Sequence, residues 1–149
     1  MSLINEKLVV LNLDSPDRHA ATRVLAQALA DEGRVTNLDG FLADVRKREE
    51  QMPTGLPGGI GIPHARSAFV TEPSLVFGRS PQGIDWGAED GPATLIFLIA
   101  APEGGGEEHL KILASLARRL MRTEFRQSLS NAPDATTVVD VVTREVVNP

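Results

Sequence analysis

Apolar side chains recur every three or four residues through much of the chain, which is the spacing of one face of an α-helix. The pattern predicts helices over residues 16–32, about 38–50, about 107–121 and 123–129. We expect Thr123 to cap the last of these helices. The valine-rich segment 138–146 is ambiguous, because valine favours strands whereas the spacing and the preceding Asp134 favour a helix. We predict a helix there.

Shorter, continuous apolar runs predict strands. These runs cover residues 8–13, 75–78 and 94–101, and a further short apolar strand ends at His64. Residues 94–101 are apolar on both faces of the predicted strand. We therefore expect this strand in the middle of a sheet that helices cover on each side, which is a layered α/β architecture.

Composition and charge narrow the classes of function. A length of 149 residues predicts a single domain over residues 1–149, without a linker or a repeat. The net charge of -5 argues against a nucleic-acid partner, since binding to phosphate backbones requires a basic surface. The longest apolar run is far shorter than the roughly 20 residues that cross a bilayer, so we expect no direct membrane insertion. The lack of cysteine and of a secretory signal makes the cytoplasm the expected location.

Candidate chemistry is concentrated at two histidines. His64 follows the glycine-rich residues 58–63, and His109 lies in the first turn of the third predicted helix. A histidine nucleophile accepts a phosphoryl group without a cofactor if backbone N–H groups or a helix N-terminus stabilise the transferred oxygens. The glycine-rich run offers backbone N–H groups, and the turn at 104–109 leads into a helix whose N-terminus could face an anion. Arg48 could donate further hydrogen bonds to that anion. Phosphoryl transfer on His64 is therefore one candidate reaction.

Other interpretations of the same residues stay open at this point. His64 could be an ordinary capping or surface residue, and the glycines could form no more than a set of turns. A zinc site would have to use His64, His109 and His19 without any cysteine, so we expect no metal. The glycine-rich run lacks the Gly-Lys-Ser/Thr ending of a P-loop, and the chain has no Gly-x-Ser-x-Gly elbow of a serine hydrolase.

An ordered series of motifs spans most of the chain. In sequence order they are Arg48-Glu49, Thr54-Gly55-Leu56, Gly59-Ile60-Gly61-Ile62-Pro63-His64, Gly83-Ile84-Asp85-Trp86-Gly87, Asp90-Gly91, Ala100-Ala101-Pro102 and His109-Leu110. Together they resemble the EIIA domain of the bacterial phosphoenolpyruvate-dependent sugar phosphotransferase system, in its fructose/mannitol class.

The resemblance implies a fold, a reaction and a set of site residues. The fold would be a three-layer α/β/α sandwich with a mixed central sheet. His64 would be phosphorylated on its tele nitrogen by the phosphocarrier HPr, and would donate the phosphoryl group to a cysteine of EIIB for uptake of a fructose- or mannitol-type sugar. His109 would support this reaction without being phosphorylated, and Arg48 and Thr54 would belong to the active site. EIIB would link the chain to the membrane domain EIIC, and no cofactor would be needed.

Two residues depart from the family pattern. Pro57 and Gly61 replace the usual glycine and alanine, and Pro57 has no N–H group to donate to an anion. Three alternatives also follow from the resemblance: a nitrogen-related regulatory protein whose phosphorylation controls a protein partner, a non-phosphorylated structural domain that would lack the histidine pair, and a piece of a fused transporter instead of a free-standing EIIA. We expect an apolar docking patch near His64, with Met52, Phe69 and Val70 as candidate members.

Overall fold

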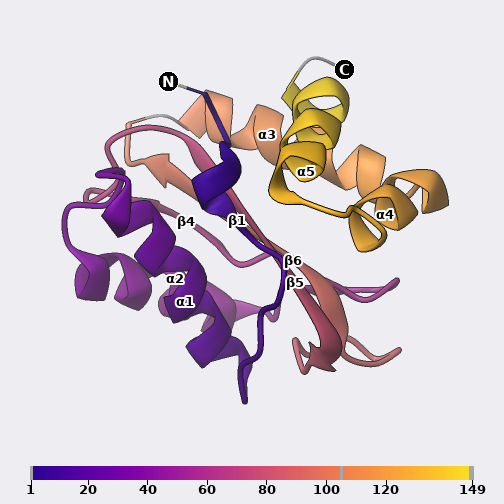
Figure 1. The fold of residues 1–149 in the computed structure, drawn as a ribbon. Coiled ribbons are helices and arrows are strands. Elements are labelled where there is room, and N and C mark those ends of the chain that lie inside the picture. The colour runs from indigo at the N-terminus through magenta and orange to yellow at the C-terminus, as the bar shows by residue number, and fades with distance from the viewer. Residues whose placement is uncertain (1, 105, 148–149) are drawn as a thin grey trace.

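A six-stranded mixed sheet lies between two layers of helices in the computed structural model, which describes residues 2–104 and 106–147 (Figure 1). The strands are β1 (Val9–Val10), β2 (Gly55–Leu56), β3 (Ile60–Gly61), β4 (His64–Ser67), β5 (Ser74–Ile84) and β6 (Ala93–Pro102). The main path of the sheet has the order β1-β5-β6-β3-β2, and β4 also pairs with β6. The antiparallel pairs are β5–β6 and β2–β3, and the other pairs are parallel. The predicted α/β class with a mixed sheet is confirmed.

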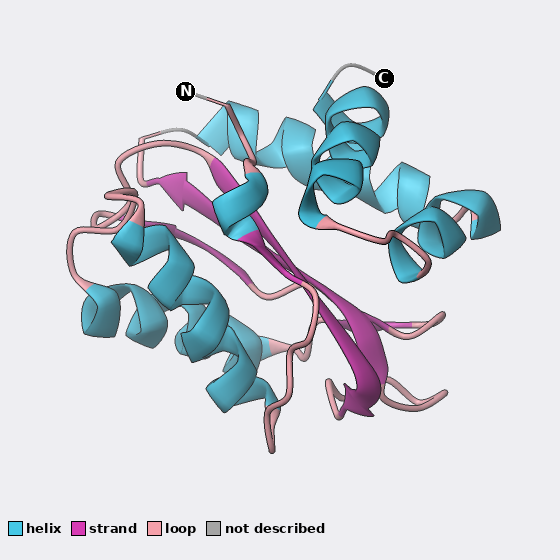
Figure 2. Ribbon diagram, in the orientation of Figure 1, coloured by secondary structure: helices cyan, strands magenta, loops and turns pink. Residues whose placement is uncertain are grey.

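Helices cover both faces of this sheet (Figure 2). The α-helices are α1 (Arg18–Asp31), α2 (Leu38–Gln51), α3 (Gly106–Leu120), α4 (Thr123–Ser130) and α5 (Ala135–Val142). A 3₁₀ turn, η1 (Glu6–Leu8), precedes β1, and a π-helical turn, η2 (Thr143–Val147), follows α5. The first two helices form one layer, and α3, α4 and α5 form the other (Figure 1). The helix predicted for the valine-rich segment is therefore present.

Strand β6 is the centre of the sheet, as its two apolar faces predict. It pairs with β5 along one edge and with both β3 and β4 along the other. Residues 95–101 of this strand are all buried, because helices of both layers pack over it. This strand positions the site, since the parallel register that pairs His64 with Ile99 places the histidine beside the centre of the molecule.

Element boundaries differ from the predictions where local hydrogen bonds override the apolar pattern. The strand predicted over 8–13 contains only Val9–Val10. It begins after residue 8 because residues 6–8 form a 3₁₀ turn capped by the side chain of Asn5. Helix α1 begins at Arg18, after the side chain of Asp17 accepts a hydrogen bond from Ala20 N. The prediction that Thr123 caps α4 is wrong. Arg122 occupies the cap position, and it makes no side-chain capping bond.

Candidate functional site

His64 is the first residue of β4 and is half-buried. Pro63 precedes it, and the carbonyl oxygen of Pro63 accepts a hydrogen bond from Ile99 N at 3.0 Å. The backbone just before the histidine is therefore attached to the central strand. A ring anchored in this way has a defined position relative to the sheet, unlike a ring on a mobile loop.

One hydrogen bond determines which ring nitrogen of His64 can react. Nδ1 lies 2.8 Å from the carbonyl oxygen of Ile62. A carbonyl oxygen only accepts hydrogen bonds, so Nδ1 carries the hydrogen. The neutral ring then has its lone pair on Nε2, the tele nitrogen. His64 is thus prepared to act as a nucleophile through Nε2.

The surroundings also keep this ring neutral. Burial lowers the pKa of His64 below its ordinary value of 6.5, because the charged imidazolium loses solvation. The hydrogen bond to Ile62 and the charge of Glu49 raise the pKa, whereas the charge of Arg48 lowers it. The net effect is a lowered pKa. The nucleophilic form therefore predominates at neutral pH.

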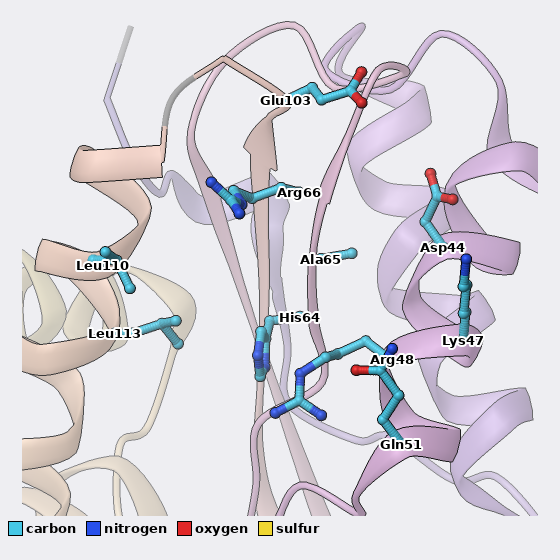
Figure 3. A pocket seen from close by; sticks show the side chains of 10 residues that line it. All are labelled: Asp44, Lys47, Arg48, Gln51, His64, Ala65, Arg66, Glu103, Leu110 and Leu113. Carbon is cyan, nitrogen blue, oxygen red and sulfur yellow. The ribbon is translucent and has the colours of Figure 1, made fainter.

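A cavity of about 580 Å³ lies beside His64 (Figure 3). Four parts of the fold line it: α2, β4, the turn after β6, and α3. The lining residues are Asp44, Lys47, Arg48, Gln51, His64, Ala65, Arg66, Glu103, Leu110 and Leu113. The cavity therefore joins both helical layers at one end of the sheet. Its charged side chains of both signs and its two leucines suit a contact that combines an anionic group with an apolar partner surface.

Arg48 lies where the sequence predicts it, next to the histidine. Figure 3 shows its guanidinium group reaching toward the ring of His64. One guanidinium nitrogen, Nη1, lies 3.3 Å from the carbonyl oxygen of Met52, to which it donates a hydrogen bond. The planar guanidinium group carries five N–H donors, so it suits the oxygens of a phosphoryl group. The structure thus brings two of the predicted site residues together.

Thr54, which the sequence predicts at the active site, is bonded to a neighbouring carboxylate. It is buried and is not among the residues that line the cavity. Its hydroxyl donates a hydrogen bond of 2.6 Å to Oε1 of Glu49, and its backbone N–H donates one of 2.6 Å to Oε2 of the same carboxylate. The hydroxyl of Thr54 is therefore bonded to Glu49, and a direct contact of Thr54 with a phosphoryl group stays a prediction.

Glu49 is a buried residue for which the sequence predicts no role. Only 7% of it is exposed, and its carboxylate also pairs with Arg18 at 3.6 Å. In the sequence it belongs to the charged run 46–50, which is typical of a solvated helix face. The one available signal was its position in the Arg48-Glu49 motif, and that motif did not indicate burial.

The glycine-rich run does not form the expected cradle of amides. Strands β2 and β3 make a hairpin, and Gly58 and Gly59 occupy its turn with φ angles of 95° and 78°, which favour glycine. None of residues 55–61 lines the cavity, and the amide of Gly58 donates to Asp90. The replacement of alanine by glycine at position 61 has a steric reason, since a Cβ there would lie 2.7 Å from the ring of Trp86.

His109 belongs to helix α3, but its side chain lies outside the described part of the structure. The predicted support of His64 by His109 therefore stays a prediction, as does the anion contact of the turn that includes Gly105. Leu110 and Leu113 of the same helix do line the cavity. The backbone that carries His109 is thus part of the helix that borders the site.

Only part of the predicted docking patch is exposed. Met52 is 65% exposed, and Leu110 at the cavity is 66% exposed. Phe69 is half-buried against the core, and Val70 is buried. Val70 is therefore a core residue and not a member of the patch.

The described side chains include no group of three or more histidine, aspartate or glutamate residues that could hold a metal ion. Within residues 2–104 and 106–147, none of the helices combines the length and the apolar character that crossing a bilayer requires.

Comparison with protein families gives one match over nearly the whole chain. The model of the family described as "Phosphoenolpyruvate-dependent sugar phosphotransferase system, EIIA 2" matches residues 2–145. The chain is 40% identical over 142 residues to the "PTS system fructose-specific EIIA component" of Haloferax volcanii, covering 93% of this chain and 92% of the relative.

A fused relative and a solved structure extend the comparison. The chain is 35% identical over 141 residues to the "PTS system fructose-specific EIIABC component" of Bacillus subtilis, covering 94% of this chain and 22% of that longer protein. The structure of the nitrogen regulatory protein IIA-Ntr from Neisseria meningitidis superimposes with a TM-score of 0.87 at 27% identity, covering 95% of this chain and 97% of that one.

Proposed function

Because the chain belongs to the EIIA 2 family of the phosphoenolpyruvate-dependent sugar phosphotransferase system, we propose that His64 is the residue that carries its phosphoryl group. Members of this family are phosphotransferases with a phosphohistidine intermediate, and the chain is a phosphoryl-transfer component of a sugar phosphotransferase system. The observation that carries the assignment to His64 is the hydrogen bond from Nδ1 to Ile62, which leaves Nε2 as the nucleophile beside Arg48.

The proposed reaction has two transfers. Nε2 of His64 attacks the phosphorus of the phosphohistidine on HPr, a new N–P bond forms, and the electrons of the broken N–P bond return to the carrier's imidazole. A cysteine thiolate of EIIB then attacks the same phosphorus, and the N–P bond to His64 breaks. Arg48 donates hydrogen bonds to the phosphoryl oxygens in both steps, where fixed positive charge stabilises the transition state.

We also propose the sugar and the partners. Fructose, or a related sugar of the mannitol type, is the best-supported substrate of the whole system, since the Haloferax volcanii relative is named as fructose-specific. HPr is the donor and EIIB the acceptor, and the fused Bacillus subtilis relative supports the second partner because its name combines EIIA with B and C components. The chain would act in the cytoplasm, and EIIB would connect it to EIIC. His109 would support His64.

A regulatory role is the second candidate. It is favoured by the similarity to the nitrogen regulatory protein IIA-Ntr. In that case the phosphorylation state of His64 would control binding to a protein partner. Adding the cognate EIIB to the phosphorylated chain separates the two roles, because rapid discharge to its cysteine supports sugar transport, whereas retention of the phosphoryl group supports regulation.

Intact-mass spectrometry tests the assignment of the phosphorylated residue. The wild-type chain, His64→Ala and His109→Ala are incubated with phosphoenolpyruvate, enzyme I and HPr. We expect the mass of one phosphoryl group on the wild type and on His109→Ala, and its loss after mild acid treatment. Label on His64→Ala would contradict the proposal, and so would an unlabelled wild type beside an active HPr control.

A further inference from the structure

We propose that the buried carboxylate of Glu49 is a positioning group for His64, acting through Thr54 and Ile62 to hold the imidazole in its reactive orientation and tautomer. The inference rests on the proposed role of His64 as phosphoryl acceptor. Glu49 does not line the cavity, so it is not a catalytic residue in the sense of contacting the phosphoryl group.

Three consecutive contacts connect the carboxylate to the histidine. Glu49 accepts both the N–H and the hydroxyl of Thr54, each at 2.6 Å. The carbonyl oxygen of Thr54 accepts a hydrogen bond from Ile62 N at 3.1 Å. The carbonyl oxygen of Ile62 lies 2.8 Å from Nδ1 of His64. Thr54 is therefore fixed at two points, and the Ile62 peptide that orients the ring is attached to it.

The burial of the Glu49 carboxylate requires the hydrogen bonds and the ion pair that surround it. A buried carboxylate is unfavourable unless hydrogen bonds and an opposite charge compensate it. Here Arg18 provides the charge at 3.6 Å, and the two hydrogen bonds are of the short, charge-assisted kind. Both of these bonds go to the residue that precedes the hairpin leading to His64. The carboxylate thus connects the end of α2 to the backbone before the histidine.

Electrostatics provides a second link between the same two residues. The negative charge of Glu49 raises the pKa of His64 and opposes the effect of Arg48. The other described charged residues that line the cavity are Asp44, Lys47, Arg66 and Glu103. Removal of the Glu49 charge should lower the pKa of His64 further, because the imidazolium loses a favourable interaction.

The test compares Glu49→Gln with Glu50→Gln. Both substitutions remove one negative charge from neighbouring positions of α2, but Glu50 is exposed and pairs with Arg46 at 3.6 Å across one helical turn. Two quantities are measured on each folded chain: the imidazole ¹⁵N chemical shifts of His64 during a pH titration, and the rate of phosphoryl transfer from phospho-HPr. Affinity for HPr is measured separately.

We expect Glu49→Gln to lower the pKa of His64, to increase the fraction of the Nε2–H tautomer, and to slow phosphoryl transfer by about tenfold or more, since small misplacements of reacting groups have effects of this size. Affinity for HPr should not change, because Glu49 lies beneath the surface. Glu50→Gln should match the wild type. A folded Glu49→Gln chain with the tautomer and rate of Glu50→Gln would overturn the inference.

Variants of Thr54 decide the question if Glu49→Gln does not fold. Thr54→Val keeps the size of the side chain but removes the hydroxyl donor, whereas Thr54→Ser retains it. The inference requires that Thr54→Val increases the Nε2–H tautomer of His64 and slows phosphoryl transfer. Thr54→Ser should keep the tautomer and the transfer rate of the wild type. Wild-type shifts and rate in Thr54→Val would overturn it. The tautomer measurement needs no phosphate, so it still decides this inference if the wild-type chain is never phosphorylated and the proposed function fails.

Discussion

At His64, the carbonyl oxygen of Ile62 and the charge of Arg48 have opposite effects on protonation. The carbonyl accepts the Nδ1 hydrogen and favours the charged ring, whereas Arg48 disfavours it by repulsion. Burial has the largest effect and lowers the pKa below 6.5. A neutral ring with a free choice of tautomer would be a poorer nucleophile than one whose reactive nitrogen is set by a fixed acceptor.

Replacement of Arg48 by glutamine should raise the pKa of His64, because the imidazolium is no longer opposed by a neighbouring positive charge. Phosphoryl transfer should also slow, since the guanidinium donors are lost. An NMR titration of the His64 imidazole measures the first effect. Arg46→Gln is the matched control, because Arg46 is an exposed residue of the same helix that pairs with Glu50. An unchanged or lowered pKa in Arg48→Gln would contradict the assigned electrostatics.

Among the elements, helix α2 contributes most to the site. Arg48 and Glu49 lie in its last turn, so one helix supplies both a cation that lines the cavity and a buried carboxylate. Its N-terminus is capped by Asn37, whose side-chain oxygen accepts a hydrogen bond from Gly40 N at 3.0 Å. Its other end is connected to Thr54 through Glu49. The helix is therefore attached at both ends.

Asn37→Ala should lower the free energy of unfolding by about 1 kcal/mol, the usual cost of losing an N-cap side chain. The effect should be on stability and not on the pKa of His64, because the cap lies at the opposite end of α2. Urea unfolding measures it. Asn131→Ala is the control, since within the described part of the chain no hydrogen bond of the Asn131 side chain is observed and the residue is exposed at the end of α4. Equal losses in both variants would show that the cap of α2 contributes nothing specific.

Across the whole molecule, the site depends on the central strand. β6 pairs with β4, which begins at His64, and its buried residues pack under both helical layers. Phe97 of β6 lies opposite Phe77 of β5, with ring centroids 5.3 Å apart. This aromatic pair lies in the core that joins the two layers. Removal of either ring should therefore lower the stability of the whole chain.

Phe97→Ala should reduce the free energy of unfolding by about 3–5 kcal/mol, because it removes a fully buried ring and leaves a cavity. Met121→Ala, at a side chain that is 83% exposed, should change stability by less than about 0.5 kcal/mol. Chemical denaturation followed by circular dichroism compares the two. Similar stabilities for the two variants would rule out β6 as the centre of the core.

The patterns that were predicted correctly share a local cause. Amphipathic spacing revealed the helices, and the doubly apolar run revealed β6, since each signal is contained in one segment. The two-residue strand β2 escaped detection, because a strand this short has no periodicity and depends on its pairing partner. The short strand expected to end at His64 is only partly correct, since β3 ends at Gly61 and His64 begins the separate strand β4. The irregular register between Arg79 and Ile84 lets β5 continue past the predicted end at residue 78, through Pro81 and Gly83.

The sequence by itself determined the layered α/β class, the central strand and the residue types of a histidine phosphoryl site, because these follow from the order and spacing of side chains along the chain. Only the tertiary structure decided that Arg48 faces His64, that Thr54 bonds to a buried Glu49, and that Ile62 sets the tautomer. Burial and hydrogen-bond direction depend on which segments meet in space. The charged run 46–50 does not indicate that the carboxylate of Glu49 is buried. This burial arises only when α2 packs on α1 and on the loop that follows α2.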